Sequence, residues 1–412
     1  MKRRNFLKQS TLASSLFFVP NFVKAFEQVA KKSLGYKKLV IIQLSGGNDG
    51  LNTVIPFTND LYYSNRPELS IKKNKLIKVT DELGFHTSLA PLKNLYDQGY
   101  LSIINNVGYP NPSRSHFRSS DIWQTASGAN EYLDTGWLGR YIEQYGKIPY
   151  MGIELDDTLS LIMKGKNSNG IATKNPRTLF QNTQTPYFKK IINHQSDSHL
   201  SEHNLGYLYK TMIEAKSSAK YIYETSKIYK SEFTYPKNPF GKQLKTTAEF
   251  INSNLESKVY YASMGGFDTH ANQANRQSNL LNTFSTAMEV FVNDLKQHNT
   301  FKDTLILTFS EFGRRVQQNG AGGTDHGAAN NVFVIGEDLK TKGFYNAAPN
   351  LSKLDKNGDL IHTVDFRSIY ATVLDQWLQV DDVSILNKSF SKLDFIYLHF
   401  LVHFYLLFHF NL

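Results

Sequence analysis

Short apolar runs and amphipathic stretches alternate along most of the chain. Residues 38–44 read Lys-Leu-Val-Ile-Ile-Gln-Leu, a continuous run rich in β-branched residues that is typical of a strand covered on both faces. Similar runs predict strands at 100–107, 258–262, 304–309 and 331–335. Apolar side chains recur at intervals of three and four over 280–295 and again over 366–378, which predicts helices there.

This alternation predicts an α/β fold in which a mostly parallel central sheet carries helices on both faces. Residues 151–256 differ from the rest because they are rich in Lys, Asn, Ser, Thr and Tyr and carry only weak strand signals. We expect them to form an inserted cap, with helices over 206–230, on a main domain that spans 26–395.

The first 25 residues have the pattern of an export signal. Arg3 and Arg4, followed by Phe6, Leu7 and Lys8, precede a mildly apolar stretch over 10–23, and the chain then reads Val-Lys-Ala. The segment resembles a twin-arginine signal, which implies export by the Tat machinery to the periplasm or beyond. The alternative is a basic amphipathic N-terminal helix. The stretch is too short and too weakly apolar for a stable membrane span.

The C-terminal residues 396–412 are almost entirely apolar and aromatic, interrupted by His399, His403 and His409. His399 and His403 share the spacing of a metal pair on a helix, yet no acid accompanies them. We expect an interfacial helix in contact with a membrane, a buried helix, or a tail unrelated to the core fold. The stretch is short for a membrane span.

The composition is that of an ordinary globular protein, with 41% hydrophobic and 20% charged residues. There are no cysteines, which excludes disulfides, thiolate metal sites and a cysteine nucleophile. The formal net charge is +10, but residues 1–25 hold five basic residues and no acid. The remaining excess is small and scattered, so the sequence predicts no nucleic-acid partner.

Acidic and histidine side chains occur in glycine-rich turns at the predicted strand ends. Because parallel strands end at the same edge of a sheet, which is where α/β proteins bind ligands, we expect these turns to converge. The candidate metal ligands are Asp49 in Gly-Gly-Asn-Asp-Gly, Asp268 and His270 in Gly-Gly-Phe-Asp-Thr-His, Glu311 in Ser-Glu-Phe-Gly-Arg, and Asp325 and His326 in Thr-Asp-His-Gly.

Imidazoles and carboxylates from separate loops are the groups that surround divalent cations such as zinc, manganese, magnesium or calcium. Each motif taken alone has a simpler interpretation as a surface turn, and Glu311 with Arg314 also fits a helix-capping acid beside a solvent-exposed arginine. The occurrence of all of them at predicted strand ends favours a metal-centred site.

The segment Pro-Ser-Arg-Ser-His-Phe supplies candidates for catalysis. A hydroxyl of Ser113 or Ser115 beside a cation can act as a nucleophile, and Arg114 or Arg314 can bind the oxygens of an anion. His116 lies in the same segment. The alternative for each serine is capping of a helix predicted over 116–125.

Taken in order, these motifs resemble those of the exported DUF1501 family, from the twin-arginine segment to about residue 378. That family resembles, more distantly, the alkaline phosphatase and sulfatase superfamily. The resemblance implies an alkaline-phosphatase-like fold in which Asp49 is the first acid, Ser113 or Ser115 the nucleophile, Asp268 and His270 further ligands, Glu311 the acid of an Asp-His pair, and His326 the last histidine.

The sequence departs from the superfamily pattern at three points. Phe312 stands where the pair has its histidine, so one metal loses a ligand unless Asp325 or His116 replaces it. Asp268 and His270 are two residues apart instead of four. Pro110 replaces the modified cysteine, which excludes a formylglycine sulfatase.

Two functions follow as hypotheses. The first is an exported metal-dependent hydrolase that acts on phosphate or sulfate esters, with a small anionic or carbohydrate-linked substrate. The second is a non-catalytic exported binding or assembly protein that keeps a degraded metal site, and Phe312 favours this alternative.

Overall fold

The computed structural model describes residues 37–146, 148–193 and 204–397. The predicted signal at 1–25 lies outside the described residues, as does the predicted tail from residue 398 onwards. Ile396, the first residue of that tail, is buried and pairs with Leu339. The described residues from Lys38 onwards form one compact unit. Over the described ranges, no helix has the length and apolarity needed to cross a membrane.

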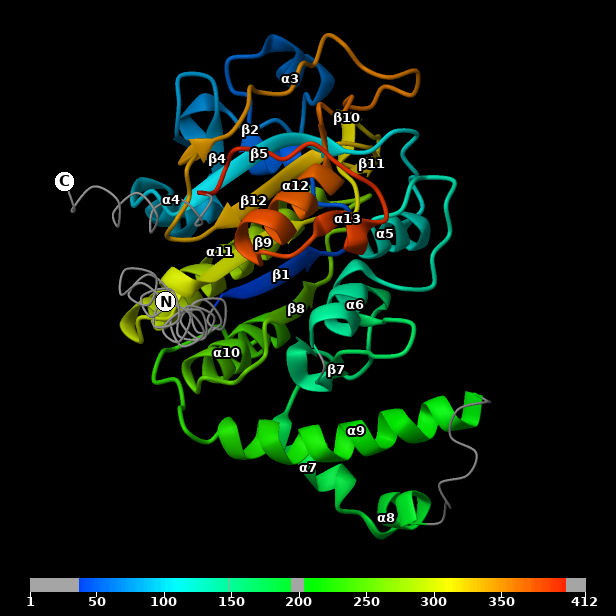
Figure 1. Cartoon of the computed structure of the whole chain (residues 1–412). Helices are drawn as coiled ribbons and strands as arrows, with labels where there is room; N and C mark the ends of the chain where they lie inside the picture. The colour runs from blue at the N-terminus through cyan, green and yellow to red at the C-terminus, as the bar shows by residue number, and fades with distance from the viewer. Residues whose placement is uncertain (1–36, 147, 194–203, 398–412) are drawn as a thin grey trace, which may run out of the picture. The chain divides into compact units, whose positions relative to one another are not determined.

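A mixed sheet organises this unit (Figure 1), which confirms the predicted α/β class. In the described part of the chain the sheet has nine strands, and they cross it in the order β13-β5-β12-β9-β1-β8-β6-β7, with β14 paired to β5. They are β1 (Lys38–Leu44), β5 (Leu101–Gly108), β6 (Gly152–Glu154), β7 (Ile171–Ala172), β8 (Val259–Met264), β9 (Thr304–Phe309), β12 (Asn330–Ile335), β13 (Gly343–Phe344) and β14 (Val364–Asp365).

Strand β12 runs against its neighbours. It is antiparallel to both β5 and β9, whereas β1 is parallel to β8 and β9. The start of β12 therefore lies at the edge where β5, β1, β8 and β9 end. A sheet with all strands parallel would have placed the segment before β12 at the opposite edge, so this reversal is what brings it to the other loops.

Two helical layers cover the sheet. Alternate side chains of a strand point to opposite faces, so Val40 and Ile42 join one apolar core and Leu39 and Ile41 join the other. The first core includes α4 (Ala90–Asp97), α10 (Pro239–Asn252) and α11 (Gln273–Gln297), and the second includes α5 (His116–Thr125), α6 (Trp137–Tyr141), α12 (Phe366–Thr372) and α13 (Asp382–Leu386). The helices expected at 280–295 and 366–378 are confirmed as α11 and α12, the latter continued by a π-helical turn at Val373–Trp377.

The segment at 151–256 is less separate than the sequence indicated. Strand β6 pairs with β8 and with β7, and α10 packs against α11, so both ends of the segment belong to the main sheet and its helical layer. The helices α7 (Pro176–Thr183), α8 (Pro186–Asn193) and α9 (Asn204–Thr225) contact one another, and Ile222 of α9 joins the first apolar core. The weak strand signals of 151–172 are explained by the shortness of β6 and β7.

Two small sheets lie beside the main one. The first pairs β2 (Val54–Ile55), β4 (Gly84–His86) and β3 (Leu76–Lys78), and short helices α2 (Gly50–Thr53) and α3 (Asp60–Asn65) precede β3. The second is an antiparallel hairpin of β10 (Arg314–Gln318) and β11 (Thr324–His326), in which Arg314 lies opposite His326. This hairpin carries His326 to the edge of the main sheet.

Candidate metal centre

Three side chains meet where the strands end. His116, Asp268 and His326 each offer a ligand atom, and these atoms lie within 4.8 Å of one another. His116 begins α5 after the β5 loop, Asp268 follows β8, and His326 ends β11 just before β12. The expected convergence of separate loops at one sheet edge is therefore present. The loop before β12 reaches this edge because β12 is antiparallel to its neighbours.

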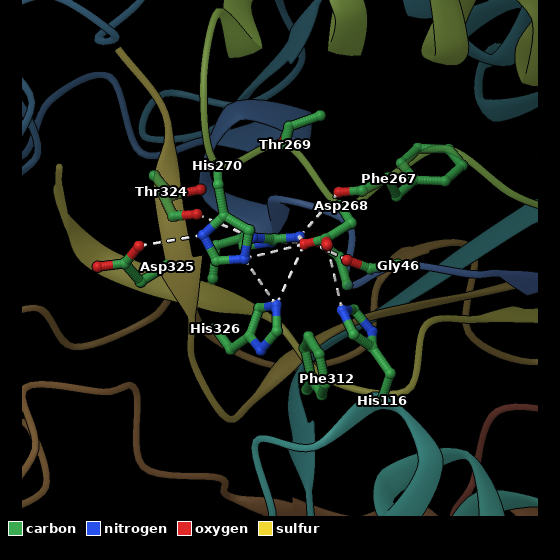
Figure 2. Close-up of polar contacts among 12 residues, drawn as sticks. Gly46, His116, Phe267, Asp268, Thr269, His270, Phe312, Thr324, Asp325 and His326 are labelled. Atoms are coloured by element: carbon green, nitrogen blue, oxygen red, sulfur yellow. Dashed lines mark hydrogen bonds and ion pairs between the residues drawn. The ribbon is translucent and has the colours of Figure 1, made fainter. Parts of the chain in front are cut away.

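Figure 2 shows the imidazoles arranged around the carboxylate of Asp268. The Nε2 atoms of His270 and His326 both lie 3.1 Å from Asp268 Oδ1, and Nε2 of His116 lies 3.4 Å from Oδ2. His270 Nε2 is also 2.9 Å from His326 Nε2. Four of the predicted site residues thus lie together, with the three imidazoles around the carboxylate of Asp268.

The other ring nitrogen of each histidine is held by an acceptor. His116 Nδ1 lies 3.0 Å from Glu311 Oε1, His270 Nδ1 lies 3.1 Å from Asp325 Oδ1, and His326 Nδ1 lies 2.8 Å from the carbonyl oxygen of Arg114. Carboxylates and carbonyls only accept hydrogen bonds, so each Nδ1 carries the proton and donates it. Metal-binding histidines are oriented in this way.

This tautomer assignment leaves two lone pairs face to face. A neutral imidazole with its proton on Nδ1 has an unprotonated Nε2, and the Nε2 atoms of His270 and His326 are only 2.9 Å apart. A proton or a metal cation must lie between them to offset the repulsion. Burial lowers the pKa of His326, which favours its neutral, ligating form at pH 7.

Glu311 contacts the cluster from outside, through His116. Its side chain is buried, Oε1 accepts a hydrogen bond from the backbone N–H of Gly46 at 2.7 Å, and the same oxygen holds His116. The hydrogen bond with Glu311 raises the pKa of His116. Glu311, predicted as a metal ligand, thus contacts His116, which lies among the catalytic candidates and is itself a candidate ligand.

Arg314 belongs to the framework of the site. It is 2% exposed, so it is not the solvent-exposed arginine considered above, and its Nη2 lies 2.7 Å from Asp268 Oδ1. Nη2 also donates to the carbonyl oxygens of Gly46 and Phe267, while Nε donates to that of Gly47 and Nη1 to that of Thr324. Burial raises the pKa of Asp268, but the hydrogen bond from Arg314 and the contact with His326 outweigh burial and hold that pKa well below its usual value. Arg314 thus keeps Asp268 ionised.

Asp49 does not join the cluster. Its Oδ2 forms an ion pair with Arg66 at 2.6 Å, in which both side chains are almost completely buried, and it also accepts a hydrogen bond from Gln273 at 2.5 Å. The glycine turn after β1 faces the site through Gly46, whereas Asp49, three residues later, begins α2 as its N-cap. Gly46 and Asp49 belong to one motif, yet only Gly46 faces the site.

The segment that supplies the catalytic candidates, residues 112–117, is held by hydrogen bonds within itself and to Asp359. Arg114 binds Asp359 through Nε and Nη2, with Nε at 2.8 Å from Oδ2, so this guanidinium already has a carboxylate partner. Ser113 Oγ accepts from the N–H of Ser115, and Ser115 Oγ accepts from the N–H of Arg118. Ser115 is the N-cap of α5, as the alternative interpretation expected, and its side chain is exposed.

The sequence matches a protein-family model over residues 36–387, and the family is described as "Protein of unknown function (DUF1501)". The chain belongs to the DUF1501 family. No curated protein matches it.

Solved structures with a similar backbone include three enzymes. PsFucS1 sulfatase from Pseudoalteromonas sp. is 12% identical, with a TM-score of 0.38, over 89% of this chain and 72% of its own. The lipoteichoic acid synthase LtaP from Listeria monocytogenes is 8% identical, with a TM-score of 0.35, over 76% and 68% of the two chains. A TAB5 alkaline phosphatase mutant is 13% identical, with a TM-score of 0.33, over 75% and 94%.

Phe312 occupies a position beside the cluster of this DUF1501 protein. Its ring centroid lies 4.9 Å from that of His116 and 4.6 Å from that of His326. The ring also fills the space above Gly47, where a Cβ atom would be 2.2 Å from Phe312 Cε2. The side chain of Phe312 offers no ligand atom to a cation.

Sequence reasoning missed Gln273, which connects Asp49 to the site loops. Gln273 Oε1 accepts hydrogen bonds from Thr269 at 3.1 Å and Thr324 at 2.6 Å, and its Nε2 donates to Asp49. Thr269 lies between Asp268 and His270, and Thr324 lies two residues before His326. A glutamine at the start of a long helix carries no sequence signal for this role.

Gly46 gives a direct test of how tightly the loops pack. Its φ is +119°, and a Cβ atom there would be 2.4 Å from the backbone nitrogen of Asp268. We expect Gly46→Ala to lower the free energy of unfolding by about 1–3 kcal/mol in urea titrations. Gly265→Ala, in the loop after β8 against which Gly46 packs, is the control because no atom lies within 4 Å of its Cβ. Equal stability of the two variants would contradict the packing described.

Proposed function

We propose that this DUF1501 protein is a hydrolase of phosphate or sulfate esters with a single divalent metal centre formed by His116, Asp268 and His326. The observation that supports the proposal best is the common orientation of the imidazoles, each tied at Nδ1 and each directing Nε2 toward Asp268. Two imidazoles and one carboxylate fit zinc or manganese better than calcium or magnesium, which prefer oxygen ligands.

A divalent cation, when bound, supplies Lewis acidity and lowers the pKa of a nucleophile. Side chains of the protein would carry out the other steps, including proton transfer. The side chain of His270 is 45% exposed, and its Nδ1 lies 3.1 Å from Asp325 Oδ1, which fixes the tautomer. Its Nε2 is therefore available to accept and return a proton. The hydrogen bond from Asn319 and that with His270 lower the pKa of Asp325 and keep it ionised.

The proposed nucleophile is a water molecule or the hydroxyl of Ser113 or Ser115. Each serine oxygen accepts one amide hydrogen, which leaves its own hydrogen free to be lost to a base. Ser115 is exposed and directly precedes His116, whereas Ser113 is half-buried. Arg114 would have to leave Asp359 to bind the oxygens of an anion, and Arg314 is fully engaged, so neither arginine is free for that role as the structure stands.

The alternative is a non-catalytic metal site in an exported binding or assembly protein. His270 Nε2 lies as close to Asp268 and His326 as a fourth ligand would. Four protein ligands close a tetrahedral site, which is typical of structural zinc, whereas catalytic sites keep a position open. His270 therefore decides between the two functions.

We further propose that the protein is exported by the twin-arginine route, on the basis of Arg3, Arg4 and the residues that follow them. Export in the folded state lets a protein acquire its metal before it crosses the membrane. The proposed substrate is a small anionic ester, free or linked to a carbohydrate.

The test is His270→Ala, with metal content measured by mass spectrometry and turnover measured on aryl phosphates and sulfates. For the hydrolase we expect about one equivalent of metal to remain and kcat to fall by about 10²- to 10⁴-fold, because a proton-transfer group is lost. The matched control is His298→Ala, at the far end of α11, which we expect to change neither value.

Loss of the metal in His270→Ala would indicate a closed four-ligand site and the non-catalytic function. Absence of metal from the unmodified protein after incubation with zinc or manganese would reject both forms of the proposal.

A further inference from the structure

A cavity of about 140 Å³ lies beside the candidate metal centre. Its walls are mainly apolar, with Tyr109, Pro112, Phe312, Leu360 and Ile361 among them. It opens in the part of the chain where the β5 loop meets the segment before β14. None of the proposed catalytic steps uses it.

The cavity and the cluster share structural parts. Phe312 lines the cavity, and its ring also contacts His116 and His326, with centroids 4.9 Å and 4.6 Å away. Pro112 lines it too and lies two residues before Arg114, whose carbonyl oxygen holds His326 Nδ1 at 2.8 Å. Phe312 is therefore common to the wall of the cavity and the surroundings of the cluster.

The size and lining define what the cavity can hold. An apolar cavity of about 150 Å³ stays dry and binds a benzene ring. The polar side chains in the lining are Tyr109, His362 and Asp355, and the hydroxyl of Tyr109 already bonds to Ser119 and to the N–H of Ser113. Burial lowers the pKa of His362, so it is neutral at pH 7, and the carboxylate of Asp355 would repel an anion. The cavity accordingly suits an uncharged ring and not the charged ester group.

We propose that this cavity binds an uncharged aromatic ring of the substrate while the ester group lies at the metal centre. The inference rests on the proposed hydrolase function for its link to catalysis, and on the cavity itself for ring binding. Phe312 then has a role of its own: it forms a wall for the ring where a second metal ligand would otherwise stand.

The first experiment locates a ring directly. Crystals of the protein soaked with 4-bromophenol, which is uncharged at pH 7, should show anomalous bromine signal between Phe312 and Leu360. This readout needs neither metal nor turnover. An empty cavity at saturating 4-bromophenol, or bromine only at other places, would overturn the inference.

The second experiment tests the link to catalysis with Ala328→Leu, which fills the cavity from a half-buried lining residue. We expect KM for phenyl phosphate to rise at least about 10-fold, as loss of hydrocarbon contacts in a specificity pocket does, with methyl phosphate unchanged. Ala347→Leu, the same substitution at an exposed position, is the control. If Ala328→Leu does not fold, Ile361→Glu at a 40% exposed lining residue serves instead.

The outcomes separate this inference from the function on which it rests. Equal KM ratios for phenyl and methyl phosphate in all variants would overturn the inference and leave the hydrolase intact. No hydrolysis of either ester, with bromine still in the cavity, would reject the hydrolase and support ring binding alone.

Discussion

Asp268→Asn is expected to abolish stoichiometric metal binding. Asp268 is the carboxylate toward which three imidazoles direct Nε2, and Arg314 keeps it ionised. The amide has nearly the same size, so the change removes charge and not volume. We expect the dissociation constant for zinc to rise by more than about 100-fold, beyond what loss of an outer-shell partner costs, and turnover to fall with it.

Isothermal titration with zinc and manganese would measure this effect, and thermal unfolding of the metal-free protein would verify the fold. Asp325→Asn is the matched control: the same change at a neighbouring carboxylate leaves an oxygen that can still accept the proton of His270 Nδ1. A dissociation constant for Asp268→Asn within a few-fold of the unmodified protein would show that the cluster does not hold the metal.

The second large effect concerns the stability of the fold and not metal binding. We expect Arg66→Met to lower the free energy of unfolding by about 3–5 kcal/mol, because it leaves the carboxylate of Asp49 buried without its partner. Arg66 also donates to the carbonyl oxygens of Val316 and Arg315 and to Asn52, so further acceptors lose their donors. Urea unfolding followed by circular dichroism would give the value.

The variant Asp49→Asn completes this test and remains informative if Arg66→Met does not fold. We expect it to lose stability while it keeps its metal, since the carboxylate of Asp49 faces Arg66 and Gln273. If the folded Asp49→Asn protein lost its metal instead, Asp49 would be a ligand as the glycine-turn motif predicted. A change of less than about 1 kcal/mol in both variants would contradict the buried ion pair.

The predicted strands show how far local pattern reaches. The run at 38–44 is β1 and the run at 304–309 is β9, because continuous β-branched stretches form strands that are buried on both faces. The direction of β12 could not be obtained in this way. The direction of a strand depends on the neighbours with which it pairs, and the pairs between β12 and β5 join residues more than 200 positions apart.

The site residues also divide into those whose place the local sequence predicts and those whose place only the tertiary structure decides. The sequence determined the turn motifs and the donor types, and the structure brings Asp268, His270 and His326 together, because these lie directly in the turns at a common sheet edge. Tertiary structure alone decided that the side chain of Asp49 binds Arg66 and that Glu311 binds His116 and not a metal. It also decided that Gln273 joins two loops. The physical reason is that the direction of a side chain and its partner are set by packing between distant segments, which no local motif encodes.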